Sequence, residues 1–314
     1  MTIVSRKSNE FKLVFAGLDN AGKTSALIAL RQKYNFYERV KNLKPTIRID
    51  YSAFKFLNKF RINLWDMGGQ KKFRKIYVGN PIYFEDTDYI YYLIDIQDET
   101  KFEETVEYLY ELLEIYRTLS YSNEVLICFS KFDPQFRKKA EFIDRANMIK
   151  ELIISHNKDI KFEFFNISYY DISSISKALS RSLTKLLNLN DINNGLKGLI
   201  NNFSCNYAIL YTDSGIVISD YYTDTMDIRE FENKISHKIS EDLEFFQRLK
   251  DDNVDIDDRI VYSSDRTDYV KQFSMTTENK KNTLYIGVST SVSSINEIKS
   301  EIEKLKGIMQ ISFG

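Results

Sequence analysis

One short segment of the chain combines glycines, a lysine and hydroxyl side chains at a spacing that suits phosphate binding. It reads Gly17-Leu18-Asp19-Asn20-Ala21-Gly22-Lys23-Thr24-Ser25. An apolar run precedes it and a helix-forming run follows it, and strand, glycine-rich loop and helix in this order form a phosphate-binding loop. Successive backbone N–H groups and the helix N-terminus then surround a β-phosphate. We expect nucleotide contacts from Asp19, Asn20, Ala21, Gly22, Lys23, Thr24 and Ser25.

Two further segments carry groups that could act on a γ-phosphate. The first ends an apolar strand at Trp65-Asp66-Met67-Gly68-Gly69-Gln70, where Asp66 can orient a Mg²⁺-bound water and Gly69 can donate its N–H. Gln70, the next residue, is placed where its side chain can orient the water that attacks the γ-phosphate. In the polar connection before the preceding strand, Thr46 can bind Mg²⁺ by its hydroxyl and the γ-phosphate by its amide. The predicted catalytic residues are Lys23, Gly69 and Gln70, and the predicted metal ligands are Thr24, Thr46 and, through water, Asp66.

A third group of residues predicts which base the site accepts. Asp133, in Ser130-Lys131-Phe132-Asp133, can accept hydrogen bonds from both N1 and N2 of guanine, whereas adenine offers no such donor pair. The Lys131 stem would lie along the base plane. After the last strand, Ser168 and the Tyr169 amide could hold this loop and the guanine O6. These residues favour GTP and GDP over ATP, with Mg²⁺ as the cofactor.

Short β-like runs that alternate with amphipathic helices must position these residues, and this alternation is typical of a parallel α/β sheet. The expected strands are 12–16, 49–57, 61–66, 89–95, 125–130 and 161–166, and the expected helices are 23–32, 101–119, 138–155 and 173–187. The second and third strands adjoin through a hairpin-like step, which predicts one antiparallel pair. We therefore expect an α/β P-loop domain with a mostly parallel six-stranded sheet over residues 1–188.

The polar, turn-rich stretch 189–195 is predicted to be a linker. Beyond it the order of elements changes to one helix, two strands, one helix, three strands and one helix. Their expected ranges are 196–203, 207–212, 215–222, 228–249, 259–264, 268–274, 283–289 and 293–308. This order predicts an α+β domain with a five-stranded antiparallel sheet over residues 196–314.

The loop 17–25 and the segments 45–47 and 65–70 resemble those of Arf-type members of the Ras superfamily of small GTPases. The whole chain resembles the Rag/Gtr GTPases, in which a roadblock (longin-like) domain follows the G domain. Three local features agree with Rag/Gtr: Ile82-Tyr83-Phe84, Ser130 before Lys131, and Tyr170-Asp171. The resemblance implies a G domain over 1–188 and a roadblock/longin-like dimerisation domain over 196–314.

The resemblance implies a guanine-nucleotide switch that hydrolyses GTP slowly without an activating protein. It also implies an exchange factor, a GTPase-activating protein and a homo- or heterodimer formed through the C-terminal domain. Two departures stand out: Ser130 replaces the usual Asn, and Leu43 stands where Gα-like proteins hold an arginine in cis. They leave open a nucleotide-stabilised scaffold with little GTPase cycling, whereas Asp133 disfavours a P-loop ATPase.

Composition excludes several other classes of function. The formal net charge of -1 predicts no general attraction to nucleic acid or anionic membranes. The cysteines, Cys128 and Cys205, lie in apolar surroundings and are expected to be reduced. No apolar run reaches membrane-spanning length, Thr2 excludes N-myristoylation, and the last four residues hold no cysteine for prenylation. We therefore expect a cytoplasmic protein that reaches a membrane only through a partner.

Overall fold

The chain forms two compact units. The structure, a computed structural model, describes residues 9–31, 43–57, 59–170, 172–187, 189–213, 215–223, 228–264, 266–277, 280–290 and 295–313. One unit holds the described residues up to Phe56 together with Phe60–Ala178, and the other holds Leu57–Lys59 and the chain from Leu179 onward. Helix α6 (Ile172–Leu187) therefore contributes to both units.

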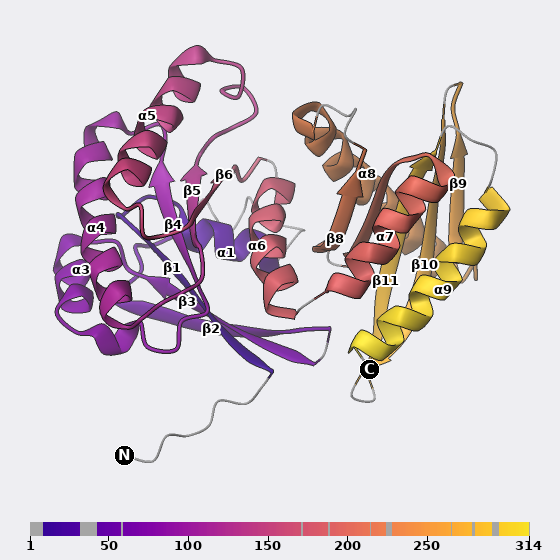
Figure 1. The fold of residues 1–314 in the computed structure, drawn as a ribbon, viewed down its shortest axis with the longest axis horizontal. Coiled ribbons are helices and arrows are strands. Elements are labelled where there is room, and N and C mark those ends of the chain that lie inside the picture. The colour runs from indigo at the N-terminus through magenta and orange to yellow at the C-terminus, as the bar shows by residue number, and fades with distance from the viewer. Residues whose placement is uncertain are drawn as a thin grey trace. The chain divides into compact units, whose positions relative to one another are not determined.

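The first unit is built on a six-stranded sheet with the order β2-β3-β1-β4-β5-β6 (Figure 1). Its strands are β1 (Glu10–Gly17), β2 (Ile49–Phe56), β3 (Phe60–Met67), β4 (Tyr89–Asp95), β5 (Val125–Ser130) and β6 (Phe162–Asn166). The β2–β3 pair is antiparallel and every other pair is parallel. The predicted mostly parallel six-stranded sheet is confirmed, and its central strands are buried because helices cover a parallel sheet on both faces.

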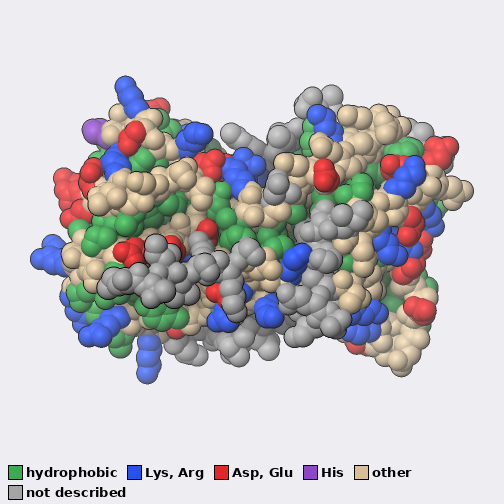
Figure 2. Space-filling model, turned by 60° about the horizontal axis from the view of Figure 1, so that its bottom comes forward, with side chains coloured by type: hydrophobic (Ala, Val, Ile, Leu, Met, Phe, Trp, Pro, Cys, Tyr) green, Lys and Arg blue, Asp and Glu red, His purple; other side chains and the backbone are tan. Residues whose placement is uncertain are grey.

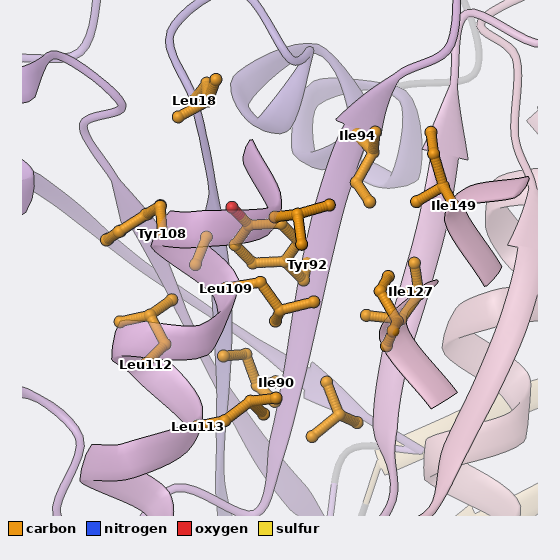
Figure 3. Packing of buried hydrophobic residues seen from close by; sticks show 14 of the residues in the cluster. Leu18, Ile90, Tyr92, Ile94, Tyr108, Leu109, Leu112, Leu113, Ile127 and Ile149 are labelled. Carbon is orange, nitrogen blue, oxygen red and sulfur yellow. The ribbon is translucent and has the colours of Figure 1, made fainter. Parts of the chain in front are cut away.

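Helices follow the strands of the first unit, and all but the one after β3 lie where the alternation predicts a helix. They are α1 (Lys23–Arg31), α3 (Lys71–Val78), α4 (Phe102–Thr118), α5 (Ala140–His156) and α6, with short 3-10 turns η1 (Pro81–Tyr83) and η2 (Glu99–Lys101). Figure 3 shows how Leu109 and Leu113 of α4 face Ile90 and Tyr92 of β4. The helices expected from the sequence do not include α3, although α3 directly follows Gln70 and buries Phe73. Gln32, the expected end of α1, lies outside the described residues.

The second unit has a five-stranded antiparallel sheet with the order β8-β7-β11-β10-β9. Its elements are α7 (Asn190–Phe203), β7 (Cys205–Thr212), β8 (Val217–Tyr222), α8 (Ile228–Asp251), β9 (Asp258–Tyr262), β10 (Thr267–Thr277), β11 (Lys280–Thr290) and α9 (Ile295–Phe313). The predicted α+β order is confirmed. Tyr211 and Tyr285 stack in the core beside Phe246 of α8. The first two residues expected in the last helix, 293 and 294, lie outside the described part of the chain.

The polar stretch 189–195 is not a linker from Asn190 onward, because it forms the first turns of α7. Buried Ile192, Leu196 and Leu199 recur at helical spacing and bind this helix to the core. Gly195 faces α9: a Cβ at this position would lie 2.0 Å from a methyl carbon of Leu305. Tertiary packing therefore overrides the weak helix propensity of the asparagines and the glycine.

The surface carries both signs of charge. On the face shown in Figure 2, basic and acidic side chains are interspersed, as expected from a formal net charge of -1. Among the described helices, none combines the length and hydropathy needed to cross a bilayer. Both cysteines are buried free thiols, and burial raises the pKa of each.

Candidate functional site

The glycine-rich loop joins the end of β1 to the start of α1, at the carboxyl edge of the parallel strands, where α/β sheets bind ligands. Gly17 has φ +138°, and a Cβ there would lie 2.4 Å from the carbonyl oxygen of Leu93. Gly22 has φ +81°, and its carbonyl oxygen accepts the first helical hydrogen bond from Ala26. Both positions therefore require glycine, and the loop leads directly into a helix N-terminus.

Lys23 lies buried beneath this loop. Its Nζ donates to the carbonyl oxygens of Gly17, at 3.1 Å, and Leu18, at 2.6 Å. Burial lowers the pKa of Lys23 to about 8, while the nearby carboxylates of Asp66 and Asp19 oppose that shift. The amine is thus a poorly solvated charge that an added anionic group would stabilise.

Three predicted metal ligands meet at the start of α1. The Thr24 hydroxyl donates to Oδ2 of Asp66 at 2.5 Å, and the Thr46 hydroxyl donates to the same oxygen at 3.2 Å. The two threonine oxygens lie 2.9 Å apart. Oδ1 of Asp66 is buried and has no hydrogen-bond partner among the described residues. An all-oxygen set with one unused carboxylate oxygen fits Mg²⁺, which prefers hard oxygen ligands and retained water.

Burial is also the main influence on the ionisation of Asp66. It raises the pKa of this carboxyl group, while the two threonine hydroxyls and Lys23 oppose the shift. A divalent cation beside Asp66 would stabilise the ionised form further. The electrostatics therefore agree with the geometry in favouring a cation at this position.

Gly69 packs directly against the glycine-rich loop. A Cβ at Gly69 would lie 2.2 Å from the backbone nitrogen of Asp19, so only glycine fits there. Arg74 of α3 is buried, and its Nε donates to the Gly69 carbonyl at 2.9 Å. The same guanidinium group pairs with Glu104 of α4 and lies 5.0 Å from the ring centre of Tyr108. Arg74 thereby fixes the peptide that carries the predicted γ-phosphate donor.

Gln70 occupies the N-cap position of α3, with φ -64° and ψ 139°, and is half-buried. It directly follows Gly69, so the predicted water-orienting side chain starts beside the predicted phosphate donor. The neighbouring Gly68 N–H donates to the Arg48 carbonyl at 2.6 Å. This bond ties the segment after β3 to the segment that carries Thr46.

The predicted base-recognition residues also come together. Oδ1 of buried Asp133 accepts a hydrogen bond from Ser168 Oγ at 2.6 Å. Oδ2 accepts one from Gln97 Nε2 at 3.2 Å, and the same amide donates to the Lys131 carbonyl at 2.8 Å. Lys131 has φ +56°, and its Nζ pairs with Asp95 at 2.5 Å. Ser168 thus holds the loop as predicted, while Gln97 adds a bond that the sequence reasoning missed.

Ser130, the departure from the usual Asn, is fully buried and donates to the Ile94 carbonyl at 3.1 Å. The Ile96 N–H donates to the Ser130 carbonyl in return. Both bonds join the ends of β4 and β5. A serine can therefore tie these two strand ends together just before the loop that carries Asp133.

Tyr169 departs from its predicted role, in which only its amide was expected to contribute. Its hydroxyl oxygen would lie 1.4 Å from a Cβ built on Gly22, so the side chain reaches across to the phosphate loop. Neither Arg74 nor Gln97 was assigned a role in the nucleotide site from the sequence. A usable signal existed for both, because Arg74 lies one helical turn after Gln70 and Gln97 follows the end of β4.

The glycine-rich loop, its buried lysine, the oxygen cluster and the Asp133 loop together define a nucleotide site of the P-loop G-protein class. The chain belongs to the Gtr1/RagA G protein family, because the profile of the Gtr1/RagA G protein conserved region matches residues 12–241. It is a GTP-binding regulatory GTPase of the Ras superfamily with Rag-like and Arf-like features.

Two relatives that match this chain by sequence are named as ADP-ribosylation factor-like proteins. The chain is 31% identical over 174 residues to the ADP-ribosylation factor-like protein alp41 of Schizosaccharomyces pombe (strain 972 / ATCC 24843), a match that covers 55% of this chain and 85% of that protein. It is 34% identical over 110 residues to ADP-ribosylation factor-like protein 3 of Caenorhabditis elegans, covering 35% and 55%. A structure of the Arl6 BBS3 small GTPase from Trypanosoma brucei with bound nucleotide analogue GppNp is 19% identical, covers 56% of this chain and 97% of that chain, and gives a TM-score of 0.46.

Proposed function

We propose that this GTPase binds GTP and GDP with Mg²⁺ and acts as a switch that hydrolyses GTP slowly. The observation that carries the proposal is the cluster of Thr24, Thr46 and Asp66 beside Lys23. Thr46 comes from a separate segment, so its place in the cluster links the metal to that segment. Such a link is what a γ-phosphate-dependent switch requires.

The residues of the site divide the work of binding. Backbone N–H groups of the loop, from Asp19 to Ser25, would surround the phosphates, and Lys23 would contact the β- and γ-phosphate oxygens. Asp133 would accept from the guanine edge, with Ser168 and Gln97 fixing its carboxylate. Bound Mg²⁺, held by Thr24, Thr46 and, through water, Asp66, would neutralise charge between the β- and γ-phosphates.

Hydrolysis then depends on positioning and charge stabilisation. Gln70 orients the attacking water, and the Gly69 N–H donates to the γ-phosphate. The buried arginine near this region, Arg74, is engaged with Gly69 and Glu104, and Leu43 stands where a cis arginine would be. Because neither position 43 nor Arg74 offers an arginine to the transition state, the expected intrinsic rate is on the order of 10⁻³ s⁻¹ or below. An activating protein would raise this rate, and an exchange factor would release GDP.

Single-turnover hydrolysis of radiolabelled GTP tests the catalytic assignment. Wild type should hydrolyse GTP in Mg²⁺ and stop in a chelator, whereas Gln70→Leu should bind GTP normally and hydrolyse it at least about tenfold more slowly. A Gln70→Leu rate equal to that of wild type would remove Gln70 from the mechanism. Tight nucleotide binding without hydrolysis in either protein would favour a nucleotide-stabilised scaffold instead.

We also propose that the second unit is a roadblock/longin-like module that dimerises, with an identical or a different chain. Its antiparallel sheet ends in β8 and β9, and proteins usually cover such sheet edges. Tyr262 on β9 is 74% exposed, and Val261 beside it is 37% exposed. We place the protein in the cytoplasm, with membrane recruitment only through a partner.

Light scattering of the full chain should give twice the chain mass of 37.0 kDa. A stable contact should bury at least about 1,000 Å² in total. A monomer that also captures no homologous partner on co-expression would contradict the dimer proposal. A monomer that forms a one-to-one complex with a second GTPase chain would assign a heterodimer.

A further inference from the structure

The Tyr169 side chain runs from the base-recognition loop to the phosphate-binding loop. Its backbone follows Ser168, whose hydroxyl binds the carboxylate of Asp133. At the other end, its hydroxyl oxygen is buried and would lie 1.4 Å from a Cβ on Gly22, with the ring carbon Cζ at 2.7 Å. The open side of Gly22 is therefore filled by the phenol.

The groups that influence the pKa of the phenol come from two parts of the candidate nucleotide site. Burial raises the pKa of Tyr169, the Asp95 carboxylate raises it further, the nearby Ser25 side chain opposes the shift, and Asp133 adds to it. Ser25 belongs to the first turn of α1, whereas Asp95 ends β4 and Asp133 lies in the loop that follows β5. One ring thus faces both ends of the candidate nucleotide site.

A guanine nucleotide must cross the same space. If Asp133 reads the base and the loop ending at Ser25 holds the phosphates, the ribose and part of the base lie between these two segments. The phenol and the nucleotide would then overlap, and well-packed atoms cannot share a volume. The next residue, Tyr170, is 65% exposed, so it is the solvent-facing member of the pair.

We propose that Tyr169 is an internal plug of the nucleotide site, whose side chain must swing out before guanine nucleotide can bind. This inference rests on the proposed function of the site and adds a step that regulates nucleotide binding there. Only the open fraction of molecules can bind, so the plug lowers the apparent association rate and the apparent affinity by that same fraction. An exchange factor or partner that moves the segment after β6 would thereby control nucleotide loading.

Stopped-flow association of a fluorescent methylanthraniloyl-GDP with full-length protein, freed of nucleotide by chelation and phosphatase treatment, tests this. Tyr169→Ala should associate at least about tenfold faster than wild type, with a Kd lowered by a similar factor and a dissociation rate within about twofold. Tyr169→Phe keeps the ring and should stay within about threefold of wild type. Tyr170→Ala is the matched control and should equal wild type.

Each outcome separates the plug from the proposed function. Binding with equal association rates in all variants would overturn the plug and leave the GTPase assignment intact. Unchanged association with faster dissociation in Tyr169→Ala would also overturn it, because the ring would then pack on bound nucleotide. If only Tyr169→Ala binds guanine nucleotide, the plug is supported, but the proposal that the wild-type protein is a nucleotide switch is contradicted. If no variant binds guanine nucleotide, both the plug and the proposed function are overturned.

Discussion

Replacement of Arg74 by alanine should destabilise the first unit and slow GTP hydrolysis together. The guanidinium group donates to the Gly69 carbonyl at 2.9 Å, and a hydrogen bond from a charged group contributes about 1.5–3 kcal/mol. Its contact with the Tyr108 ring adds about 0.5–1 kcal/mol. Its pair with Glu104, whose side chain is 43% exposed, adds at most about 1 kcal/mol. We therefore expect Arg74→Ala to lower the free energy of unfolding by about 3 kcal/mol.

Trp65, the single tryptophan of the chain, lies on β3 of the first unit and reports its unfolding in urea by fluorescence. Lys75→Ala is the matched control, because Lys75 is exposed on the same helix and its loss should change stability by less than about 0.5 kcal/mol.

Hydrolysis gives the second readout for Arg74. Without the Arg74 guanidinium group bound to its carbonyl, the Gly69 peptide loses its fixed orientation, and its N–H no longer points at the γ-phosphate. Loss of one such aligned hydrogen-bond donor lowers the rate by about 10²–10³-fold. GDP affinity should change by less than about threefold, because Gly69 is proposed to contact only the γ-phosphate. A folded Arg74→Ala protein that hydrolyses GTP at the wild-type rate would refute this reasoning.

Three further predictions concern separate parts of the site. Arg48 is exposed with φ +61°, so Arg48→Gly should raise the free energy of unfolding by about 0.5–1 kcal/mol in urea titrations, and a loss of stability would contradict the backbone argument. The pKa of Lys23 is lowered from 10.5 to about 8 in the folded protein. Below pH 8 the buried charged amine therefore lowers the free energy of unfolding, and this loss of stability disappears as the pH rises from 8 to 10.5. Nucleotide-free Lys23→Met should thus be about 2–3 kcal/mol more stable than wild type at pH 7, with the difference shrinking above pH 8; a difference independent of pH would exclude this cause. Hydrogen exchange over residues 43–49, which include Thr46, should be slower with Mg²⁺ and a non-hydrolysable GTP analogue than with GDP, and equal exchange would favour the scaffold function.

Sequence reasoning predicted the sheet of the first unit because its signals are local. A buried strand such as β4 is a continuous apolar run in the sequence. The positive φ angles of the phosphate-binding loop at positions 17 and 22 fall on glycines, which the sequence shows directly. The same holds for the cluster of Thr24, Thr46 and Asp66. Thr24 at the start of α1, Thr46 in the connection before β2 and Asp66 near the end of β3 are predicted to bind one metal ion, and their oxygens lie 2.5–3.2 Å apart in the structure.

Contacts that depend on side-chain direction were not predictable in this way. The spacing of apolar residues does not show that Gly195 faces Leu305, so polar residues of α7 were interpreted as a linker. The backbone position of Tyr169 predicted a role for its amide, whereas the direction of its ring depends on packing against Gly22. Gln97 lies two residues after the end of β4, which places it near the site, but its bonds to Asp133 and to the Lys131 carbonyl depend on the direction of its side chain.

The most direct test of the central claim is the affinity of full-length protein for GDP and for xanthosine diphosphate, in wild type and in Asp133→Asn. Asp133 accepts from the guanine N1 and N2 groups in this account, whereas an asparagine suits the xanthine edge. Wild type should prefer GDP, and Asp133→Asn should lose at least about 1.4 kcal/mol of GDP binding, which is tenfold in Kd, and gain affinity for xanthosine diphosphate. GDP affinity that stays within about tenfold of wild type, with no gain for xanthosine diphosphate, would contradict the assignment of this site to guanine nucleotides.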